Sequence, residues 1–235
     1  MSGAFFVTGT DTAVGKTFIT AGLAGYYANM GQRVGVMKPI ETGHENDQNW
    51  PEDALTLHQA AQNDDPRDIV VPYIFSPPVS PWAATQITGR VIDFPLLIQK
   101  ARDLMARYSL TFIEGAGGLA VPIDEKLTMA DIPRRLDIPI IIVSRSGLGT
   151  INHTVLTVEY ARMRGLDIRG IVMNQSREQS ISRDPSHQHN RAIIEKMTGV
   201  PVIGMIPIMP TSHKGRDLSI LVGEKIRLNL KMEGA

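Results

Sequence analysis

The sequence predicts an α/β protein with a doubly wound, mostly parallel sheet flanked by helices. Two observations lead to this fold class. Short apolar segments alternate with segments of helical periodicity over the whole 235 residues, which is the pattern of strands joined by helices. Several of the short segments are almost continuously apolar, as expected for strands that are covered on both faces. No shift in composition divides the chain, so we expect a single domain over residues 1–235.

The first predicted strand, helix and strand have well-marked ends. Ala4–Thr8 is a short apolar strand, and Lys16–Met30 carries apolar and small residues at helical spacing. This helix is expected to end at Gly31, because glycine accepts the left-handed conformation that follows many helices. The strand Val34–Lys38 is expected to end at Pro39, since proline has no N–H to donate to a neighbouring strand.

The later elements continue the alternation. Leu55–Ala61 and Phe94–Tyr108 are predicted helices, and the apolar residues of the second lie on one face. The remaining predictions, in order, are strand Leu110–Ile113, strand Pro139–Val143, helix Ile151–Arg164, strand Ile168–Met173, helix His189–Met197 and strand Val202–Ile206. The polar stretch Gln175–His187 is interpreted as a mobile surface loop, and the proline-rich stretch Pro72–Phe94 is expected to wrap the surface.

Composition and charge exclude several classes of protein. The chain has 24 Lys and Arg against 24 Asp and Glu, so it lacks the overall basic charge of many nucleic-acid-binding domains. It has 0 cysteines, which excludes a disulfide framework, a thiolate zinc site and a cysteine nucleophile. No apolar run approaches the roughly 20 residues of a membrane helix, and no basic segment typical of a secretory signal stands at the N-terminus. We expect a cytoplasmic protein that binds neither nucleic acid nor membrane.

A phosphate-binding loop follows the first predicted strand. The segment from Gly9 to Gly15 continues into Lys16 and Thr17, where a helix begins. The usual loop, G-x-x-x-x-G-K-[ST], has four residues between its glycines, whereas this one has five. Its backbone N–H groups would surround phosphates, Lys16 would reach the outer ones, and Thr17 would offer a hydroxyl to Mg²⁺. The strand–loop–helix context predicts nucleotide binding; the alternative is an ordinary helix start.

Two acidic residues could complete a Mg²⁺ site. Glu114 ends the predicted strand LTFIEG, and the carboxyl ends of parallel strands face the ligand crevice. The glycine-rich residues Gly115–Gly118 would let a phosphate approach the backbone there. Asp53 lies at the start of the next predicted helix. The alternatives are a solvated strand end for Glu114 and, for Asp53, an acid that merely favours the helix dipole.

Lys38 ends the second predicted strand. Pro39 and Gly43 bracket a tight turn directly after it, which places Lys38 on the same sheet edge as the phosphate loop. A lysine there can meet a second anionic group or stabilise charge that develops in a transfer step. The alternative is a lysine whose stem packs at the strand end while its ammonium stays in water.

Other polar residues near predicted strand ends give weaker signals. Asn152, in the segment Gly147–His153, lies either at the crevice or merely caps a helix. Asn174 ends a predicted strand, where its amide could contact a nucleobase or form a turn. His187 and His189 are interpreted as solvated histidines, because no acidic or cysteine partner accompanies them.

Six segments together resemble the dethiobiotin synthetases, ATP-dependent ring-closing enzymes of biotin synthesis. They are Val7–Thr17 (VTGTDTAVGKT), Lys38–Gly43 (KPIETG), Asp53–Ala54 (DA), Glu114–Pro122 (EGAGGLAVP), Gly147–Thr154 (GLGTINHT) and Met173–Asn174 (MN). They occur in the family's order and cover the chain from residue 7 to about 207. The five-residue spacing of the phosphate loop is itself a feature of that family.

The resemblance implies a homodimer with a phosphate-loop fold that binds ATP, Mg²⁺, CO₂ and 7,8-diaminononanoate. One amine of the diamine would capture CO₂ as a carbamate. The carbamate would attack the γ-phosphate of ATP, and the second amine would close the ureido ring and expel phosphate. No covalent intermediate with a protein side chain is implied, so the protein's part is positioning and charge stabilisation.

The resemblance also implies a role for each matching residue. The catalytic residues would be Lys16 and Lys38, which hold the γ-phosphate and the carbamate, and the metal ligands would be Thr17, Asp53 and Glu114. The ATP-binding residues would be Ala13, Val14, Gly15, Lys16, Thr17, Phe18, Asp53, Glu114, Gly115, Ala116, Gly117, Asn174, Gln175 and Pro207, with Asn174 and the backbone near Pro207 at the adenine. The residues that bind the other substrates would be Thr12, Lys38, Thr42, Gly149, Thr150 and Asn152, the last three from the partner subunit.

A different class of protein with the same fold is the main alternative. Dimeric ATPase switches of the partitioning and nitrogenase-iron-protein kinds usually carry a second lysine early in the phosphate loop. Here Thr10 follows Gly9, and no lysine precedes Lys16. Two positions depart from the dethiobiotin synthetase pattern: Ala13, where acidic residues are common, and Gly147, where some members have lysine. We expect these departures to affect substrate affinity.

Overall fold

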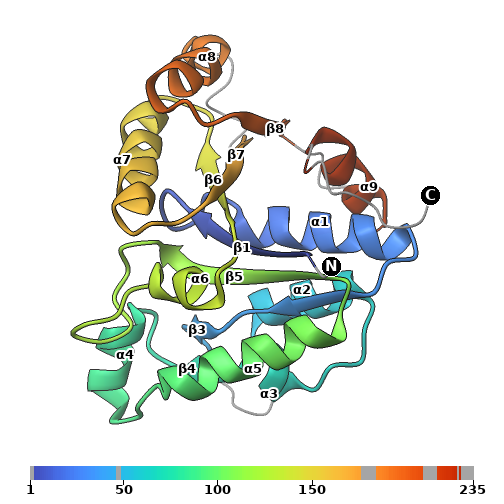
Figure 1. Ribbon diagram of the computed structural model, residues 1–235, viewed down its shortest axis with the longest axis vertical. Coiled ribbons are helices and arrows are strands. Elements are labelled where there is room, and N and C mark those ends of the chain that lie inside the picture. Colours follow the sequence, from blue (N-terminus) through green and yellow to red (C-terminus); the bar gives the residue numbers. More distant parts are fainter. Residues whose placement is uncertain (1–2, 46–48, 176–183, 209–215, 227, 229–235) are drawn as a thin grey trace.

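Figure 1 shows the computed structural model, which describes residues 3–45, 49–175, 184–208, 216–226 and 228. Its elements are β1 (Gly3–Gly9), α1 (Lys16–Asn29), β2 (Val34–Met37), β3 (Ile40–Thr42), α2 (Glu52–Ala61), α3 (Arg67–Val70), β4 (Tyr73–Phe75), α4 (Pro81–Thr88), α5 (Phe94–Arg107), β5 (Leu110–Gly118), α6 (Asp131–Leu136), β6 (Ile140–Arg145), α7 (Thr150–Met163), β7 (Ile168–Asn174), α8 (His187–Thr198), β8 (Val202–Ile206) and α9 (Arg216–Lys225). Strands and helices alternate, and the predicted α/β fold class is confirmed.

A six-stranded sheet runs through the middle of the molecule in the order β2-β5-β1-β6-β7-β8. All neighbouring strands in it are parallel. The chain places β2 and β5 on one side of β1 and β6 to β8 on the other, so the order of strands reverses beside β1. Sheets of this kind bind ligands at the carboxyl ends of the strands near such a reversal. The short strands β3 and β4 form a separate parallel pair.

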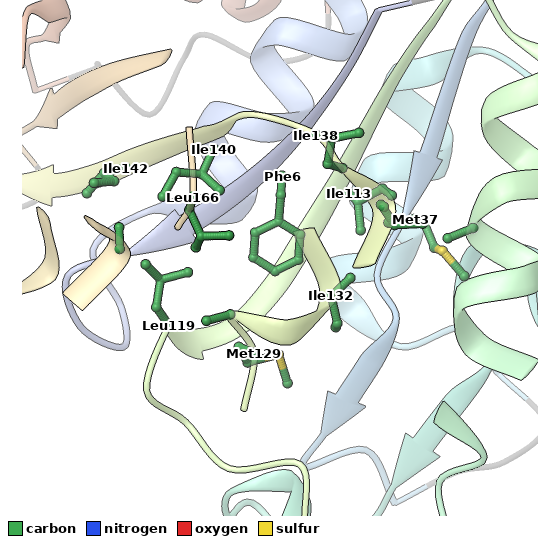
Figure 2. Packing of buried hydrophobic residues seen from close by; sticks show 14 of the residues in the cluster. Phe6, Met37, Ile113, Leu119, Met129, Ile132, Ile138, Ile140, Ile142 and Leu166 are labelled. Carbon is green, nitrogen blue, oxygen red and sulfur yellow. The ribbon is translucent and has the colours of Figure 1, made fainter. Parts of the chain in front are cut away.

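Helices cover both faces of this sheet (Figure 1). One hydrophobic cluster includes buried residues of α1, α2 and α9, and the other includes buried residues of α5, α6, α7 and α8. Successive residues of β1 enter opposite clusters: Phe5 and Val7 join the first and Phe6 the second. Figure 2 shows Phe6 surrounded by Leu119, Ile132 and other apolar side chains of the second cluster. The central strands are therefore apolar on both faces, as their sequences predicted.

The predicted elements lie where they were expected, and most of their ends differ by a few residues at most. Gly31 has φ +81°, which confirms the left-handed residue expected after α1. The largest difference is in β5, which continues beyond Ile113 to Gly118. Its register with β1 shifts between the pairs Val7–Glu114 and Gly9–Gly118, so the glycine-rich segment stays beside the phosphate loop instead of leaving the sheet.

The stretch Pro72–Phe94, expected to wrap the surface, contains β4 and α4. Pro81 lies in the first turn of α4, where a missing N–H costs nothing. The hydroxyl of Ser80 caps the helix by accepting from the N–H of Ala83, and Phe75 and Ala84 are buried. The prolines therefore mark helix and turn starts.

The polar stretch Gln175–His187 falls largely outside the described residues, which omit 176–183. Its last residue, His187, is the first residue of α8. None of the helices in the described part of the chain combines the length and the hydropathy that a membrane crossing requires.

Candidate active site

The phosphate loop joins β1 to α1 and presents the N-terminus of that helix. Gly15 precedes α1 in the left-handed conformation, with φ +92°, and no side chain caps the helix. A Cβ on Gly15 would lie 2.2 Å from Nδ2 of Asn174, so only glycine fits there. Ala13 also has a positive φ, +56°, which is uncommon for a residue with a side chain. The loop therefore leaves the first N–H groups of α1 available to an anion.

Lys16 lies inside this loop. It is buried, and its Nζ donates to the backbone oxygen of Asp11 at 3.2 Å. Burial, followed by the nearby positive charge of Lys38, lowers the pKa of Lys16 below its ordinary value. Two lysine side chains are thus held close together on one side of the loop, an arrangement that polyanionic phosphates would stabilise.

Lys38 lies between two carboxylates, directly after β2. Its Nζ is 2.5 Å from Oε1 of Glu114 and 2.6 Å from Oδ2 of Asp53. Thr17 donates its hydroxyl to the same Oε1 of Glu114 at 2.8 Å. Burial alone would lower the pKa of Lys38, but the charges and hydrogen bonds of Glu114 and Asp53 raise it above its ordinary value. The alternative of a Lys38 ammonium in open water is wrong, because the residue is only 3% exposed.

Asp53 is held in place by Glu41. The two carboxylate oxygens of Glu41 accept hydrogen bonds from the backbone N–H groups of Asp53 at 2.9 Å and of Ala54 at 3.0 Å. These N–H groups belong to the first turn of α2, so Glu41 caps that helix from β3. Although burial would raise it, the pKa of Asp53 lies below its ordinary value because of Lys38 and of hydrogen bonds from Lys38 and Thr17. Burial raises the pKa of Glu41.

The oxygen atoms at this position fit a nucleotide-bound Mg²⁺. Oε2 of Glu114 is buried without a hydrogen-bond partner among the described residues, and it could accept a cation. Mg²⁺ prefers carboxylate and hydroxyl oxygens and is usually held by one or two carboxylates, phosphates and water. In keeping with that pattern, the described residues contain no group of three or more His, Cys, Asp or Glu side chains that could hold a metal by themselves. Thr17, Asp53 and Glu114 are therefore suitable ligands.

A cavity of about 490 Å³ opens beside these groups. Side chains from the phosphate loop, β3, α2 and the end of β5 line it. Of the predicted site residues, those that line it are Thr12, Ala13, Gly15, Lys16, Thr17, Lys38, Thr42, Asp53, Ala116 and Gly117. The structure thus brings the two lysines, two proposed metal ligands and both threonines of the proposed substrate site to one cavity.

A smaller cavity of about 250 Å³ lies across the phosphate loop and shares Thr12 and Ala13 with the first. Asn174 and Gln175 line it. Asn174 is buried and donates from Nδ2 to the backbone oxygen of Val14 at 3.0 Å, which ties the end of β7 to the loop. Pro207 follows β8, is exposed and lines neither cavity.

Three of the residues predicted to bind ATP are buried or packed against other side chains. Val14 is 1% exposed, so it can offer only its backbone. Phe18 packs against the hydrophobic cluster of α1 and α2. Gly115 lies against the ring of Phe6, where a Cβ would come within 2.7 Å. Close packing accounts for this glycine without any ligand.

The residues predicted to act across a subunit boundary lie at the start of α7, away from the larger cavity. Gly149 is the N-cap, with φ +88°. Thr150 is buried: its hydroxyl donates to the backbone oxygen of Arg145 at 2.5 Å and its N–H to the backbone oxygen of Gly147 at 3.2 Å. Asn152 is exposed and lies within the first turn; the helix cap is Gly149.

Several polar residues of the site were missed. Glu41 belongs to the KPIETG segment, but its sequence position gave no sign that it caps a helix eleven residues later. Arg145 reaches the phosphate loop, where it contacts Oδ2 of Asp11 at 2.6 Å. The prediction that His187 is solvated is wrong, because its side chain is only 10% exposed, and neither ring nitrogen has a hydrogen-bond partner among the described residues. His189 is exposed, as predicted.

Comparison with known proteins gives two kinds of result. A family model described as an AAA domain matches residues 3–215. The ATP-dependent dethiobiotin synthetase BioD of Bacillus thuringiensis (strain Al Hakam) is 38% identical over 207 residues, covering 88% of this chain and 84% of the relative. The protein of the same name from Anaeromyxobacter dehalogenans (strain 2CP-1 / ATCC BAA-258) is 38% identical over 223 residues, covering 94% of this chain and 98% of the relative.

Solved structures of other ATPases share the fold. A ParA family ATPase from Chlorobium tepidum TLS superposes with a TM-score of 0.55 at 15% identity, covering 97% of this chain and 92% of the other. A MinC:MinD cell division protein complex from Aquifex aeolicus has a chain with the same score and identity, covering 94% and 86%. At this identity the likeness concerns the fold alone and does not favour an ATPase switch.

Proposed function

This chain belongs to the family of ATP-dependent dethiobiotin synthetases, and we propose that the cavity beside its phosphate loop is where the reaction takes place. In this reaction ATP and CO₂ convert 7,8-diaminononanoate into dethiobiotin, ADP and phosphate. The observation that carries the proposal is the meeting of Lys38, Asp53 and Glu114 next to the N-terminus of α1. These groups can bind and stabilise the anions that the reaction creates.

ATP would lie across the phosphate loop. The unpaired N–H groups at the start of α1 would hold its phosphates, and Lys16 would reach the γ-phosphate. The amide oxygen of Asn174 would accept a hydrogen bond from the adenine amine, while its Nδ2 donates to the backbone oxygen of Val14. Gln175 and the backbone near Pro207 complete the proposed base site.

Thr17, Asp53 and Glu114 would hold Mg²⁺. When bound, the ion would neutralise charge on the transferring phosphoryl group. The hydroxyl of Thr17 and the two carboxylates already meet at one place, since Glu114 accepts from Thr17 and shares Lys38 with Asp53. The residues themselves therefore need little rearrangement to accept the ion.

The chemistry needs charge stabilisation more than proton transfer by a side chain. A carbamate oxygen formed from one substrate amine would attack the γ-phosphorus, and the bond to ADP would break. The second amine would then attack the carbamate carbon and release phosphate. Lys16 and Lys38 would stabilise the developing negative charge, and Thr12 and Thr42 would orient the carbamate and the amines through hydrogen bonds.

A second copy of the chain would complete the substrate site. Gly149, Thr150 and Asn152 of the partner subunit would hold the carboxylate of the diamine. Support comes from the large apolar side chains that are exposed on α7, on α8 and just before α7, close in sequence to Gly149 and Asn152. These are Leu148, Leu156, Met163, Ile193 and Met197. Exposed apolar residues gathered on one face are typical of a protein interface.

The test uses purified protein with the diamine, bicarbonate, Mg²⁺ and ATP. We expect phosphate release together with a cyclic urea product detected by mass spectrometry. Leaving out the diamine should nearly abolish phosphate release. Hydrolysis of ATP that does not need the diamine, without the cyclic product, would contradict the proposal.

A further inference from the structure

The ammonium group of Lys38 fills a place that suits a metal ion. It lies 2.5 Å from Glu114 and 2.6 Å from Asp53, and the side chains of Lys38 and Glu114 are 4% and 0% exposed. These carboxylates are the ones that the proposed function assigns to Mg²⁺. An ion bound to the same two oxygens would lie about 2.0–2.1 Å from each. An ion that uses these two oxygens, rather than the unpartnered Oε2 of Glu114, has to displace the ammonium, so the two cations exclude each other there.

We propose that Lys38 is the resident cation of the Mg²⁺ site, and that Glu41 is a positioning residue that fixes Asp53 within it. The ammonium holds Asp53 and Glu114 together until the metal binds and then moves away from them. This inference rests on the proposed function, which supplies the metal. Two carboxylates that both contact one nitrogen would repel each other if no cation lay between them. The lysine therefore keeps the ligands assembled in advance.

Glu41 matters because the two carboxylates are not equally supported. Glu114 is fully buried within β5, whereas the side chain of Asp53 is 40% exposed at the start of α2. Pro51, the N-cap of α2, offers no side-chain hydrogen bond. The two hydrogen bonds from Asp53 and Ala54 to Glu41 therefore fix the first turn of α2 and, with it, the backbone that carries the Asp53 carboxylate.

Because Lys38 and the metal compete for the same carboxylates, metal binding is coupled to the release of Lys38. Binding of the metal releases the Lys38 ammonium, which can then reach an anionic group such as the carbamate. By thermodynamic linkage, an anion that attracts Lys38 must strengthen metal binding as much as the metal strengthens binding of that anion. The lysine thus becomes available for the reaction only when the metal is present.

The first experiment measures metal affinity without nucleotide or diamine. Mn²⁺ serves as the probe, and its free concentration is followed by electron paramagnetic resonance. Lys38→Met, or Lys38→Gln if the first variant does not fold, should bind Mn²⁺ at least about tenfold more tightly, because a competing charge is removed. Lys100→Met is the matched control, since Lys100 pairs with Asp68 on the surface and its loss changes the net charge equally. The control should bind Mn²⁺ like the unmodified protein.

The second experiment applies the same titration to Glu41. Glu41→Ala should weaken Mn²⁺ binding about tenfold, the usual scale for a residue that orients a metal ligand. Glu41→Gln keeps one acceptor oxygen and should lose less. A general loss of structure would weaken binding in the Lys38 and Glu41 variants alike, whereas we expect opposite signs. Thermal unfolding of each variant verifies that it is folded.

Two results would overturn the inference. If Lys38→Met and Lys38→Gln bind Mn²⁺ no more tightly than the unmodified protein, Lys38 does not compete with the metal and is not the resident cation of its site. If both Glu41 variants keep full Mn²⁺ affinity, Glu41 does not position Asp53. Neither result depends on turnover. If the Lys38 and Glu41 variants show the expected changes in Mn²⁺ affinity but the unmodified protein forms no cyclic urea from the diamine, the proposed function is rejected. The inference about the metal site then still stands.

Discussion

Two sets of charged residues flank the phosphate loop, and they differ in burial. On one side, Lys38 joins Asp53 and Glu114 in a network whose lysine and glutamate are almost fully buried. On the other side, Arg145 and Asp11 form a single pair at 2.6 Å whose side chains are 41% and 46% exposed. The bond lengths are similar, but water screens the second pair and not the first. Distance alone is therefore a poor guide to what an ion pair contributes.

The largest expected difference concerns stability. Glu114→Gln should lower the free energy of unfolding by about 3 kcal/mol, because it removes the fully buried partner of Lys38 and leaves only the partly exposed Asp53 to compensate that buried charge. Asp11→Asn on the other side should cost less than about 1 kcal/mol. Urea unfolding of both variants measures these values. If both variants lost the same free energy of unfolding, burial would not explain any difference between the two sets of charged residues.

The second largest expected effect concerns the rate of the reaction. Lys38→Ala is expected to reduce the rate of phosphate release with the diamine by about 10²-fold or more, the scale of losing a group that stabilises charge in the transition state. Lys100→Ala, on the surface of α5, should have near-normal activity. A Lys38→Ala variant with normal activity would remove this lysine from the mechanism.

A smaller effect is expected from the face that the proposed dimer would cover. Asn152→Ala should raise the KM for the diamine by about tenfold, as for a lost hydrogen bond to a charged group, and should leave ATP affinity unchanged. Steady-state kinetics and ATP titration separate the two outcomes. An unchanged KM for the diamine would reject the assignment across the subunit boundary.

The smallest expected effect is that of Arg145→Ala. The exposed pair with Asp11 should contribute roughly 0–1 kcal/mol to stability, and the contribution should shrink further as salt is added. Thermal unfolding at low and high ionic strength measures this. A loss of several kcal/mol that salt does not change would show that the pair acts as a buried one.

The sequence contained enough information for the fold class, the phosphate loop and most of the residues that line the larger cavity. Apolar strands and helical periodicity act locally, and the GKT motif could be interpreted because a predicted strand precedes it and a predicted helix begins within it. What could not be predicted depends on pairing between distant segments. Glu41 accepts from Asp53 only because β3 and α2 come together, and β5 continues to Gly118 only because Gly9 lies beside it.

Burial was the other property that the sequence could not supply. The alternative considered for Lys38 and the prediction for His187 both placed the polar group of the side chain in water, since charged and polar residues usually face solvent. Lys38 is buried against two carboxylates, and the side chain of His187 is only 10% exposed and lies close to Gly147 in the loop before α7. Local sequence does not reveal which neighbours the fold places around a side chain.

The contacts of Glu114 also bear on how the protein matures. Its partners Thr17 and Lys38 are 97 and 76 residues away along the chain, and both contacts require β5 to have entered the sheet between β2 and β1. A nascent chain that has emerged from the ribosome only as far as the phosphate loop lacks the carboxylate that anchors the centre. The active site should therefore form late in the synthesis of the chain, and unfinished chains should not consume ATP in the cell.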